Sequence, residues 1–366
     1  MVKPRIAPRL VVIHPGPGQH KVRRRRPRAA DVTIVGGGPA GAALAVELGR
    51  RGVRVVLYEK ARHPRFKPCG EGLLPHGVAA LREIVGVPDA PRVRGLRFQA
   101  AGMSVDADFP AGHGLVVRRD RFDAWLFERA ASTPNVDARP GTPYRGERAR
   151  VLVGADGARS MFHRRLRATV ARPLRVGLST HVAGVQGLGD RVEVFFHDDG
   201  ELYLAATGGG EALVAALFDY ARFRPDGVTH LLSAIPELRD RATRIEFTTP
   251  VLAAAPLGLR VPQIVDEDEG LILVGDAAGS PDPITGDGMA LALASTRAAA
   301  EAIVSGNLRA YAQRRLTMGR TANRLGRLLL RLSRTERRAA WVLRDLSALV
   351  PPLMRVAVGR TGCGNP

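Results

Sequence analysis

The stretch "DVTIVGGGPAGAALAVELGRRGVRVVLYEK" (residues 31–60) carries the strongest fold signal in this chain. A short apolar strand at 31–37 runs into glycines, a helix follows at about 39–51, and a second strand occupies 53–60. A strand, a helix and a strand at this spacing form a β-α-β unit, in which the two strands are parallel. The stretch therefore predicts an α/β fold of Rossmann-like type.

The glycines between the first strand and the helix follow the pattern G-x-G-x-x-G. Gly36 allows a tight turn, Gly38 lets a pyrophosphate approach the backbone, and Gly41 lets the helix pack against the strand. Glu59 ends the second strand, where it is placed to accept hydrogen bonds from a ribose. The pattern predicts a dinucleotide site but does not separate FAD from NAD. The residues predicted to form it here are Gly36, Gly38, Pro39, Ala40, Gly41, Glu59 and Lys60.

The bulk composition is that of an ordinary globular protein. The chain has 366 residues, of which 45% are hydrophobic and 25% charged, enough for about two domains and a sizeable core. Two cysteines exclude a disulfide scaffold and fit a reducing compartment. No apolar run reaches the roughly 18 residues that a membrane span needs, and "LVVI" at 10–13 is too short for a signal peptide. We expect a cytoplasmic protein.

The net charge of +20 is confined to two segments. Residues 1–30 hold nine Lys or Arg and no acid, and residues 306–366 hold thirteen Arg against Glu336 and Asp345. The remainder has equal numbers of basic and acidic side chains, so we expect no nucleic-acid partner. The Pro-rich tail at 1–30 is predicted to be disordered. It is interpreted as the result of a start codon placed too early, or alternatively as a segment that anchors the protein to an anionic membrane or a nucleic acid.

Periodicity divides the rest of the chain into two classes of segment. Helices are predicted at 74–86 and 118–132, a hairpin at 92–109 and a strand at 150–157. From 172 to 250 a period of two predicts a second sheet, which contains a hairpin turn at Asp199-Gly200 and a helix at 211–223. The nucleotide-binding domain is predicted to comprise 31–91, 115–165 and 262–307, the second domain 92–114 and 166–261, and a C-terminal helical segment 308–366.

Two later motifs also end apolar strands in an aspartate. They are "GADGARS" at 154–160 and "GDAAGSPDPITGDG" at 275–288. Together with the first motif and "RRDRFD" at 118–123, they resemble the glutathione-reductase-type FAD fold. Within it they are similar to the group of para-hydroxybenzoate hydroxylase, geranylgeranyl reductases and flavin-dependent halogenases. The resemblance covers roughly residues 31–305. It implies a discontinuous Rossmann-like FAD-binding domain, a second mixed β-sheet substrate domain and C-terminal helices.

The resemblance also implies roles for individual residues. Asp276 would bind the ribitol chain of FAD, and Arg119 would lie near the phosphate and ribose region. Asp156 and Gly157 would structure the cofactor site. Backbone N–H groups at a helix start would stabilise the negative charge of reduced flavin. The FAD-binding residues implied in these later motifs are Arg119, Asp156, Gly157, Gly275, Asp276, Pro283, Gly286, Asp287, Gly288 and Met289; no metal site is expected.

Two features favour the reductase branch of this group. Aromatic hydroxylases of the group usually have a His where this chain has Gly279, and "RFKPCGEGLLPHG" (65–77) is similar to a segment of the geranylgeranyl reductases. There Cys69 would lie near the flavin as a proton donor or a substrate-positioning group; the alternative is a small buried cysteine. Halogenases carry a Trp-x-Trp-x-Ile-Pro motif, which this chain lacks.

The resemblance implies an oxidoreductase that takes electrons from NAD(P)H and reduces C=C bonds of an apolar, isoprenoid-like substrate. The alternative is a monooxygenase that hydroxylates an apolar phenolic or polyketide substrate. A second alternative is a flavin-bound membrane-surface module without turnover, because the connection at 133–150 is shorter than is usual in this group. The C-terminal helix places Arg320, Arg324, Arg327, Arg331, Arg334 and Arg338 on one face, opposite leucines. This face suggests peripheral contact with an anionic membrane at its inner side.

Overall fold

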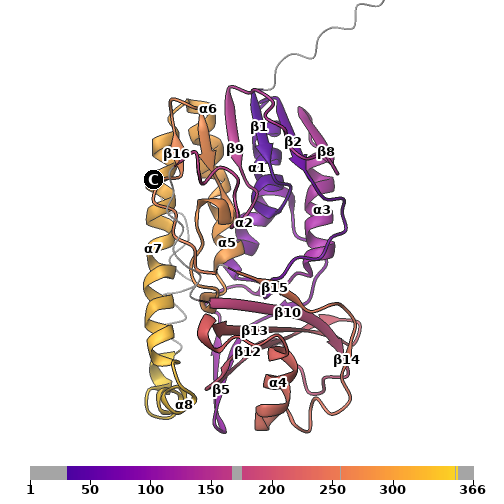
Figure 1. Ribbon diagram of the computed structural model, residues 1–366, viewed down its shortest axis with the longest axis vertical. Helices are drawn as coiled ribbons and strands as arrows, with labels where there is room; N and C mark the ends of the chain where they lie inside the picture. The colour runs from indigo at the N-terminus through magenta and orange to yellow at the C-terminus, as the bar shows by residue number, and fades with distance from the viewer. Residues whose placement is uncertain (1–30, 167–174, 256, 351, 353–366) are drawn as a thin grey trace, which may run out of the picture.

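The computed structural model describes residues 31–166, 175–255, 257–350 and 352. The tail at 1–30 and Cys363 therefore lie outside the described residues. In the described part of the chain, no helix combines the length and apolarity needed to cross a bilayer. The molecule is built from two main sheets with helices around them, and a long C-terminal helix runs along one side (Figure 1).

The first sheet contains six strands in the order β16-β17-β9-β1-β2-β8. Its strands are β1 (Val32–Val35), β2 (Val55–Glu59), β8 (Val136–Pro140), β9 (Val151–Gly154), β16 (Val265–Asp266) and β17 (Leu271–Leu273). All neighbours are parallel except β16, which is antiparallel to β17. The three motif-bearing strands β1, β9 and β17 are therefore adjacent, and the motifs that follow them meet at one edge of the sheet.

Helices cover this sheet through small side chains. The helix α1 (Pro39–Arg50) buries nine of its twelve residues, many of them Ala or Gly, because it packs among α3 (Arg119–Ala131), α5 (Gly288–Ala294) and α6 (Thr296–Ser305). The helix α2 (Pro75–Val85) packs on α5. A small three-stranded sheet, β3 (Gly72–Leu73), β7 (Gly114–Val116) and β4 (Arg92–Val93), joins this layer to the second sheet.

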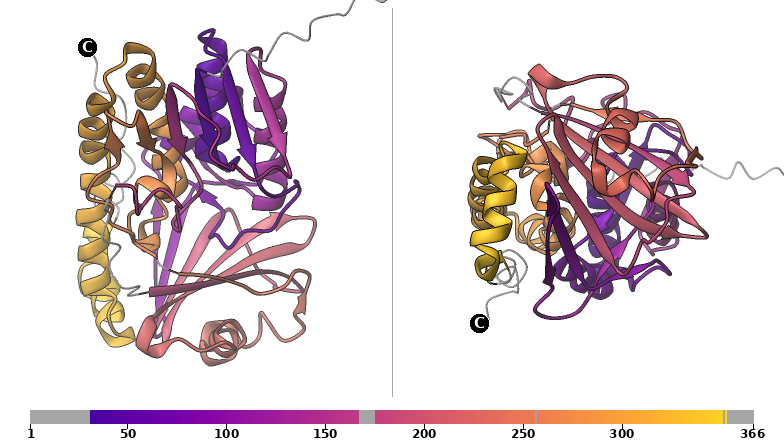
Figure 2. Two further views of the ribbon diagram at one scale, coloured as in Figure 1. Left: turned by 45° about the horizontal axis from the view of Figure 1, so that its top comes forward. Right: turned by 90° about the horizontal axis from the view of Figure 1, so that it is seen from below.

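The second sheet has the path β14-β10-β13-β12-β11-β5-β6, with β15 also on β10. Its strands are β5 (Gly95–Ala100), β6 (Met103–Asp108), β10 (Arg175–Ala183), β11 (Arg191–His197), β12 (Gly200–Gly208), β13 (Glu211–Asp219), β14 (Glu246–Phe247) and β15 (Leu252–Ala254). It is mixed, since β11 and β5 are parallel. Its outer face packs against α4 (Gly227–Ala234), while its inner face points toward the first sheet (Figures 1 and 2).

The turn predicted at Asp199-Gly200 is confirmed as the β11–β12 hairpin. The helix predicted at 211–223 is wrong. Residues Glu211–Asp219 form β13, which is hydrogen-bonded on both sides, and only a short 3₁₀ turn, Tyr220–Arg222, follows. Seven of the nine residues in β13 are buried, so both faces are apolar and the period of two is hidden.

The C-terminal helices are α7 (Leu308–Leu332) and α8 (Glu336–Asp345). The single arginine face predicted from 320 to 338 is wrong in its last part, because the helix ends at Leu332. Thr335 then caps α8 by accepting a hydrogen bond from the backbone N–H of Arg338. Arg320, Arg324, Arg327 and Arg331 remain on one exposed face of α7. Further 3₁₀ turns lie at Pro236–Leu238, Gly275–Ala278, Pro283–Thr285 and Ser347–Leu349.

Candidate functional site

The turn between β1 and α1 has the geometry that the glycine pattern predicts. Gly36 has φ +109°, in the region that favours glycine. A β-carbon on Gly41 would lie 1.9 Å from the carbonyl oxygen of Gly36, so the helix start presses directly on the turn. Beside Gly38, by contrast, the nearest atom to an added β-carbon is Arg65 Nη2, at 3.7 Å. The helix α1 has no side-chain cap, so its first N–H groups can bind an anion.

The carboxylate of Glu59 lies beside this turn and is only 5% exposed. It accepts hydrogen bonds from the backbone N–H of Gly37 (2.8 Å) and of Ala61 (2.9 Å), and Arg65 Nη2 lies 3.6 Å from it. These contacts fix the acidic group at the end of β2, as a ribose-binding carboxylate requires. Lys60 is exposed and does not line the cavity described next.

A cavity of about 290 Å³ lies between the motif-bearing edge of the first sheet and the inner face of the second. Segments more than 200 residues apart contribute to it. Of the residues predicted from sequence, those that line it are Gly38, Pro39, Ala40, Cys69, Arg119, Gly157, Gly275, Asp276, Pro283, Gly286, Gly288 and Met289. Gly36, Gly41, Glu59, Lys60, Asp156 and Asp287 do not line it. The three motifs and the Cys69 segment thus form one site.

The loop after β17 depends on glycine at two points. Gly275 has φ +59°, and a β-carbon on it would lie 2.7 Å from that of Ala40. Gly279 has φ +90°, and its β-carbon would lie 2.9 Å from the carbonyl oxygen of Leu259. In this loop conformation a His at position 279 would be strained. Any larger residue there would require the loop to move.

The segment at 286–288, just before α5, leaves open space along the cavity. Gly286 has φ +65°, and neither Gly286 nor Gly288 has an atom within 4 Å of an added β-carbon. Asp287, in contrast, is only 4% exposed and points away from the cavity, with its Oδ1 2.7 Å from His76 Nε2. The two atoms are at ion-pair distance but are not aligned for a hydrogen bond. Asp287 therefore holds the start of α5 on the side that faces His76, away from the cavity.

Asp156 holds the loop after β9. Its Oδ2 accepts a hydrogen bond from the backbone N–H of Met161 at 2.8 Å. Its Oδ1 is buried and has no hydrogen-bond partner among the described residues. A buried carboxylate oxygen without a donor is costly, so this atom is available for a hydroxyl or N–H group of a ligand.

Arg119 forms a buried ion pair with Asp123. Its guanidinium donates to both oxygens of Asp123, at 2.7 and 2.8 Å, and Arg65 Nη2 lies 3.4 Å from the same carboxylate. Burial alone would lower the pKa of Arg119, but Asp123 and Cys69 outweigh it and raise that pKa above its usual value. Arg119 is thus a permanent cation at the cavity wall, close to the sulfur of Cys69.

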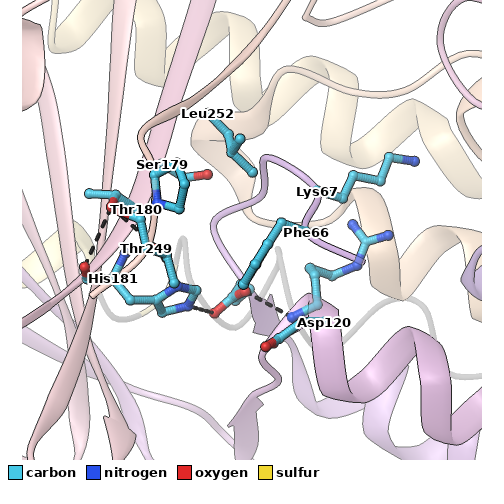
Figure 3. Close-up of a pocket in the computed structure, with 11 residues that line it drawn as sticks. Phe66, Lys67, Asp120, Ser179, Thr180, His181, Thr249 and Leu252 are labelled. Atoms are coloured by element: carbon cyan, nitrogen blue, oxygen red, sulfur yellow. Dashed lines mark hydrogen bonds and ion pairs between the residues drawn. The ribbon is translucent and has the colours of Figure 1, made fainter. Parts of the chain in front are cut away.

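Cys69 lies where the two sheets approach each other. Its backbone N–H donates to Ser179 Oγ on β10 at 3.1 Å, and its Sγ accepts from the backbone N–H of Glu71 at 3.3 Å. Glu71 has φ +53° and is 3% exposed; its carboxylate lies 2.9 Å from His181 Nε2. Figure 3 shows His181 pointing from its strand toward the loop that carries Phe66 and Lys67. No local sequence pattern indicates this contact, because His181 and Glu71 are 110 residues apart in the chain.

The far half of the cavity is apolar and is formed by the inner face of the second sheet. Its walls include Leu96, Phe98, Val192, Val194, Ala215 and Leu217. Residues next to them on the same strands, such as Phe195 and Ala216, point outward toward α4. The polar side chains that this sheet adds to the wall are Ser179 on β10 and Tyr203, whose hydroxyl donates to Glu201 Oε2 at 2.8 Å.

Glu201 and Tyr203 belong to a buried charge network that sequence reasoning also missed. Arg175 Nη2 lies 2.9 Å from Glu201 Oε1, and Arg175 Nη1 lies 2.8 Å from Asp282 Oδ1. Burial raises the pKa of the Glu201 carboxyl despite the opposing effect of Arg175, and burial together with Glu201 raises the pKa of Tyr203 well above 10. Because Asp282 directly precedes Pro283, the network ties the apolar sheet to the glycine-rich loop.

Comparisons with known proteins agree with this geometry. A family model described as an FAD binding domain matches residues 29–146. Menaquinone reductase from Mycobacterium tuberculosis is 30% identical over 319 residues, which cover 76% of this chain and 78% of that protein. Geranylgeranyl diphosphate reductase from Rhodobacter capsulatus is 28% identical over 311 residues, 75% of each chain. The solved structure of a flavin-dependent brominase matches with a TM-score of 0.76 at 20% identity, covering 90% of this chain and 94% of that one. The last likeness concerns the fold alone.

Proposed function

Because the chain belongs to the geranylgeranyl reductase and menaquinone reductase group of FAD-dependent oxidoreductases, we propose that it reduces carbon–carbon double bonds of an apolar, isoprenoid-like substrate. NAD(P)H would be the electron donor. The observation that carries this proposal is the cavity, which joins the cofactor-binding motifs to a wall of Leu, Val, Phe and Ala side chains. An apolar wall of this kind binds a hydrocarbon by excluding water from it.

The residues on the cofactor side fit FAD. The uncapped start of α1 and the open space beside Gly38 suit a pyrophosphate, and the buried Glu59 carboxylate suits a ribose. The partnerless Oδ1 of Asp156 and the carboxylate of Asp276 provide acceptors for hydroxyl groups further along. When bound, FAD supplies the transfer of hydride between NAD(P)H and the substrate.

The chain's own residues would then bind the substrate, exclude water and move one proton. Saturation of a C=C bond adds a hydride to one carbon and a proton to the other. Cys69 lies at the junction of the cofactor and apolar parts of the cavity, with its sulfur beside the cation of Arg119. We assign the proton transfer to the Cys69 thiol. Tyr203 is a poorer proton donor to the substrate, because its hydroxyl already donates a hydrogen bond to Glu201.

Turnover of candidate polyprenyl lipids with NAD(P)H tests the proposal, with the product analysed by mass spectrometry with and without oxygen. Reduction adds two mass units to the product and does not need oxygen. A gain of sixteen that appears only in air would identify a monooxygenase and overturn the proposal. If NAD(P)H fails to bleach the absorbance of the bound flavin in the absence of oxygen, the chain is not an NAD(P)H-dependent enzyme at all.

A further inference from the structure

The outer face of α7 carries a row of arginines without acidic partners. Arg320, Arg324, Arg327 and Arg331 are all exposed, at alternating steps of four and three residues. Such steps place the four side chains along one side of the helix, over a length of about 16 Å. We call these four residues the arginine row.

Other arginines of the same helix are paired. Arg309 and Arg314, at the beginning of α7, lie at ion-pair distance from Glu267 and Glu301. In the described residues no carboxylate lies at ion-pair distance from any member of the arginine row. The residues outside the described ranges contain no Asp or Glu in their sequence, so no acidic side chain remains to pair with the row.

The inner face of α7 contacts the loop at 279–285, which follows β17 and lines the cavity. Arg315 is 7% exposed and donates from Nη2 to the carbonyl oxygen of Gly279 at 2.8 Å. Gly326 packs so closely that a β-carbon on it would lie 3.2 Å from Thr285 Cγ2. Figures 1 and 2 show α7 running along the side of the molecule past both sheets. One helix diameter, about 10 Å, thus separates the arginine row from the loop that lines the cavity.

We propose that the arginine row docks the protein on the surface of an anionic lipid bilayer. Four unpaired guanidinium groups in a straight row complement a layer of lipid phosphates, since each is worth about 1 kcal/mol near such a surface. The exposed Leu316, one turn before Arg320, and Leu328, beside Arg327, supply apolar groups at the edge of the row. The rationale for a bilayer rather than a nucleic acid rests on the proposed function, because an isoprenoid-like substrate resides in lipid.

Vesicle binding of the full chain tests this without any turnover, so failure of docking and failure of the proposed reaction are separate results. Binding is measured by flotation with phosphatidylglycerol vesicles and with phosphatidylcholine vesicles, at low and at high salt. The variant R320Q/R324Q/R327Q/R331Q removes the row. A matched control, R82Q/R121Q/R148Q/R239Q, removes four exposed arginines elsewhere and changes the net charge equally.

We expect binding to phosphatidylglycerol only, weakened by salt. At about fivefold per arginine, the row variant should lose several hundredfold in its partition coefficient, and the control less than tenfold. Both variants should retain bound FAD. The proposal is overturned if wild-type protein does not float with phosphatidylglycerol, or if both variants lose binding equally. It is also overturned if a duplex DNA fragment binds more tightly than the vesicles and depends on the same row.

Discussion

Replacing Arg175 with methionine would test the buried network beneath the cavity. The side chain of Arg175 is 6% exposed and lies at ion-pair distance from three carboxylates, those of Glu201, Asp282 and the exposed Asp219. Methionine fills similar space without charge. After the change, Glu201 keeps only the Tyr203 hydroxyl as a donor, whereas Asp282 keeps the backbone N–H of Ile284 and is more exposed. The loss in stability should therefore come mainly from Glu201.

The size of that loss follows from the ordinary pKa of a glutamate. A buried Glu201 without Arg175 can avoid its charge by taking a proton. From the ordinary pKa of 4.5, doing so at pH 7 costs at most about 3.4 kcal/mol at 1.36 kcal/mol per pH unit, and at most about 0.7 kcal/mol at pH 5. The loss caused by the substitution is smaller than these limits, because burial already raises the pKa of Glu201 in the wild-type protein. Without Arg175 the folded pKa of Glu201 rises further above the unfolded value. Protonation of Glu201 then contributes to the unfolding free energy of the variant. This contribution is fully present below pH 4.5 and is lost as the pH rises through the pKa of Glu201 in the folded state.

Urea unfolding at pH 5 and pH 7 measures this difference. Arg175→Met should lose up to about 3 kcal/mol of unfolding free energy at pH 7 and under about 1 kcal/mol at pH 5. The double variant Arg175→Met/Glu201→Gln should recover most of the loss and show little dependence on pH. Arg94→Met is the control, since its partner Asp190 and Arg94 itself are both more than half exposed. Equal losses at both pH values, or a double variant as unstable as the single one, would refute the reasoning.

Three further predictions concern the cofactor and the reaction. Gly41→Ala should abolish FAD binding, measured as the flavin absorbance of the purified protein, because the added β-carbon would overlap the carbonyl oxygen of Gly36. Gly189→Ala is the control, since Gly189 has open space around it and the flavin absorbance should be unchanged. Asp276→Ala should raise the dissociation constant of FAD by about 10- to 150-fold, the worth of a hydrogen bond to a charged group, as measured by fluorescence titration; an unchanged constant would remove Asp276 from the site. Cys69→Ala should lower kcat by about 10²- to 10⁴-fold with FAD content intact, and a variant that reduces substrate at the wild-type rate would exclude the thiol as proton donor.

The cofactor half of the site was predictable because its signals are local. Each motif is a strand followed by glycines, to which the second and third motifs add an aspartate, and the parallel order of β17, β9 and β1 then brings the motifs together. Even the break between α7 and α8 has a local signal, since Thr335 is a favourable N-cap residue. The arginine spacing continues through the break and hides this signal.

The substrate half was not predictable in the same way. The strand β13 is buried on both faces and rich in Ala and Leu, so its composition favours a helix while its neighbours in the sheet make it a strand. Arg175, Glu201 and Asp282 come from three distant segments. Their pairing depends on the register of the second sheet and on the approach of a loop, which no local pattern encodes.

The strand order of the first sheet also has a consequence for biosynthesis. A ribosome releases β1 first, yet its neighbour β9 lies more than 100 residues later and the next strand, β17, more than 200 residues later. Both are needed to bring the cofactor motifs together, and α7 then presses on the loop at 279–285. The nascent chain therefore cannot close this site domain by domain as it emerges. Cofactor capture should be a late event, when nearly the whole polypeptide has left the exit tunnel.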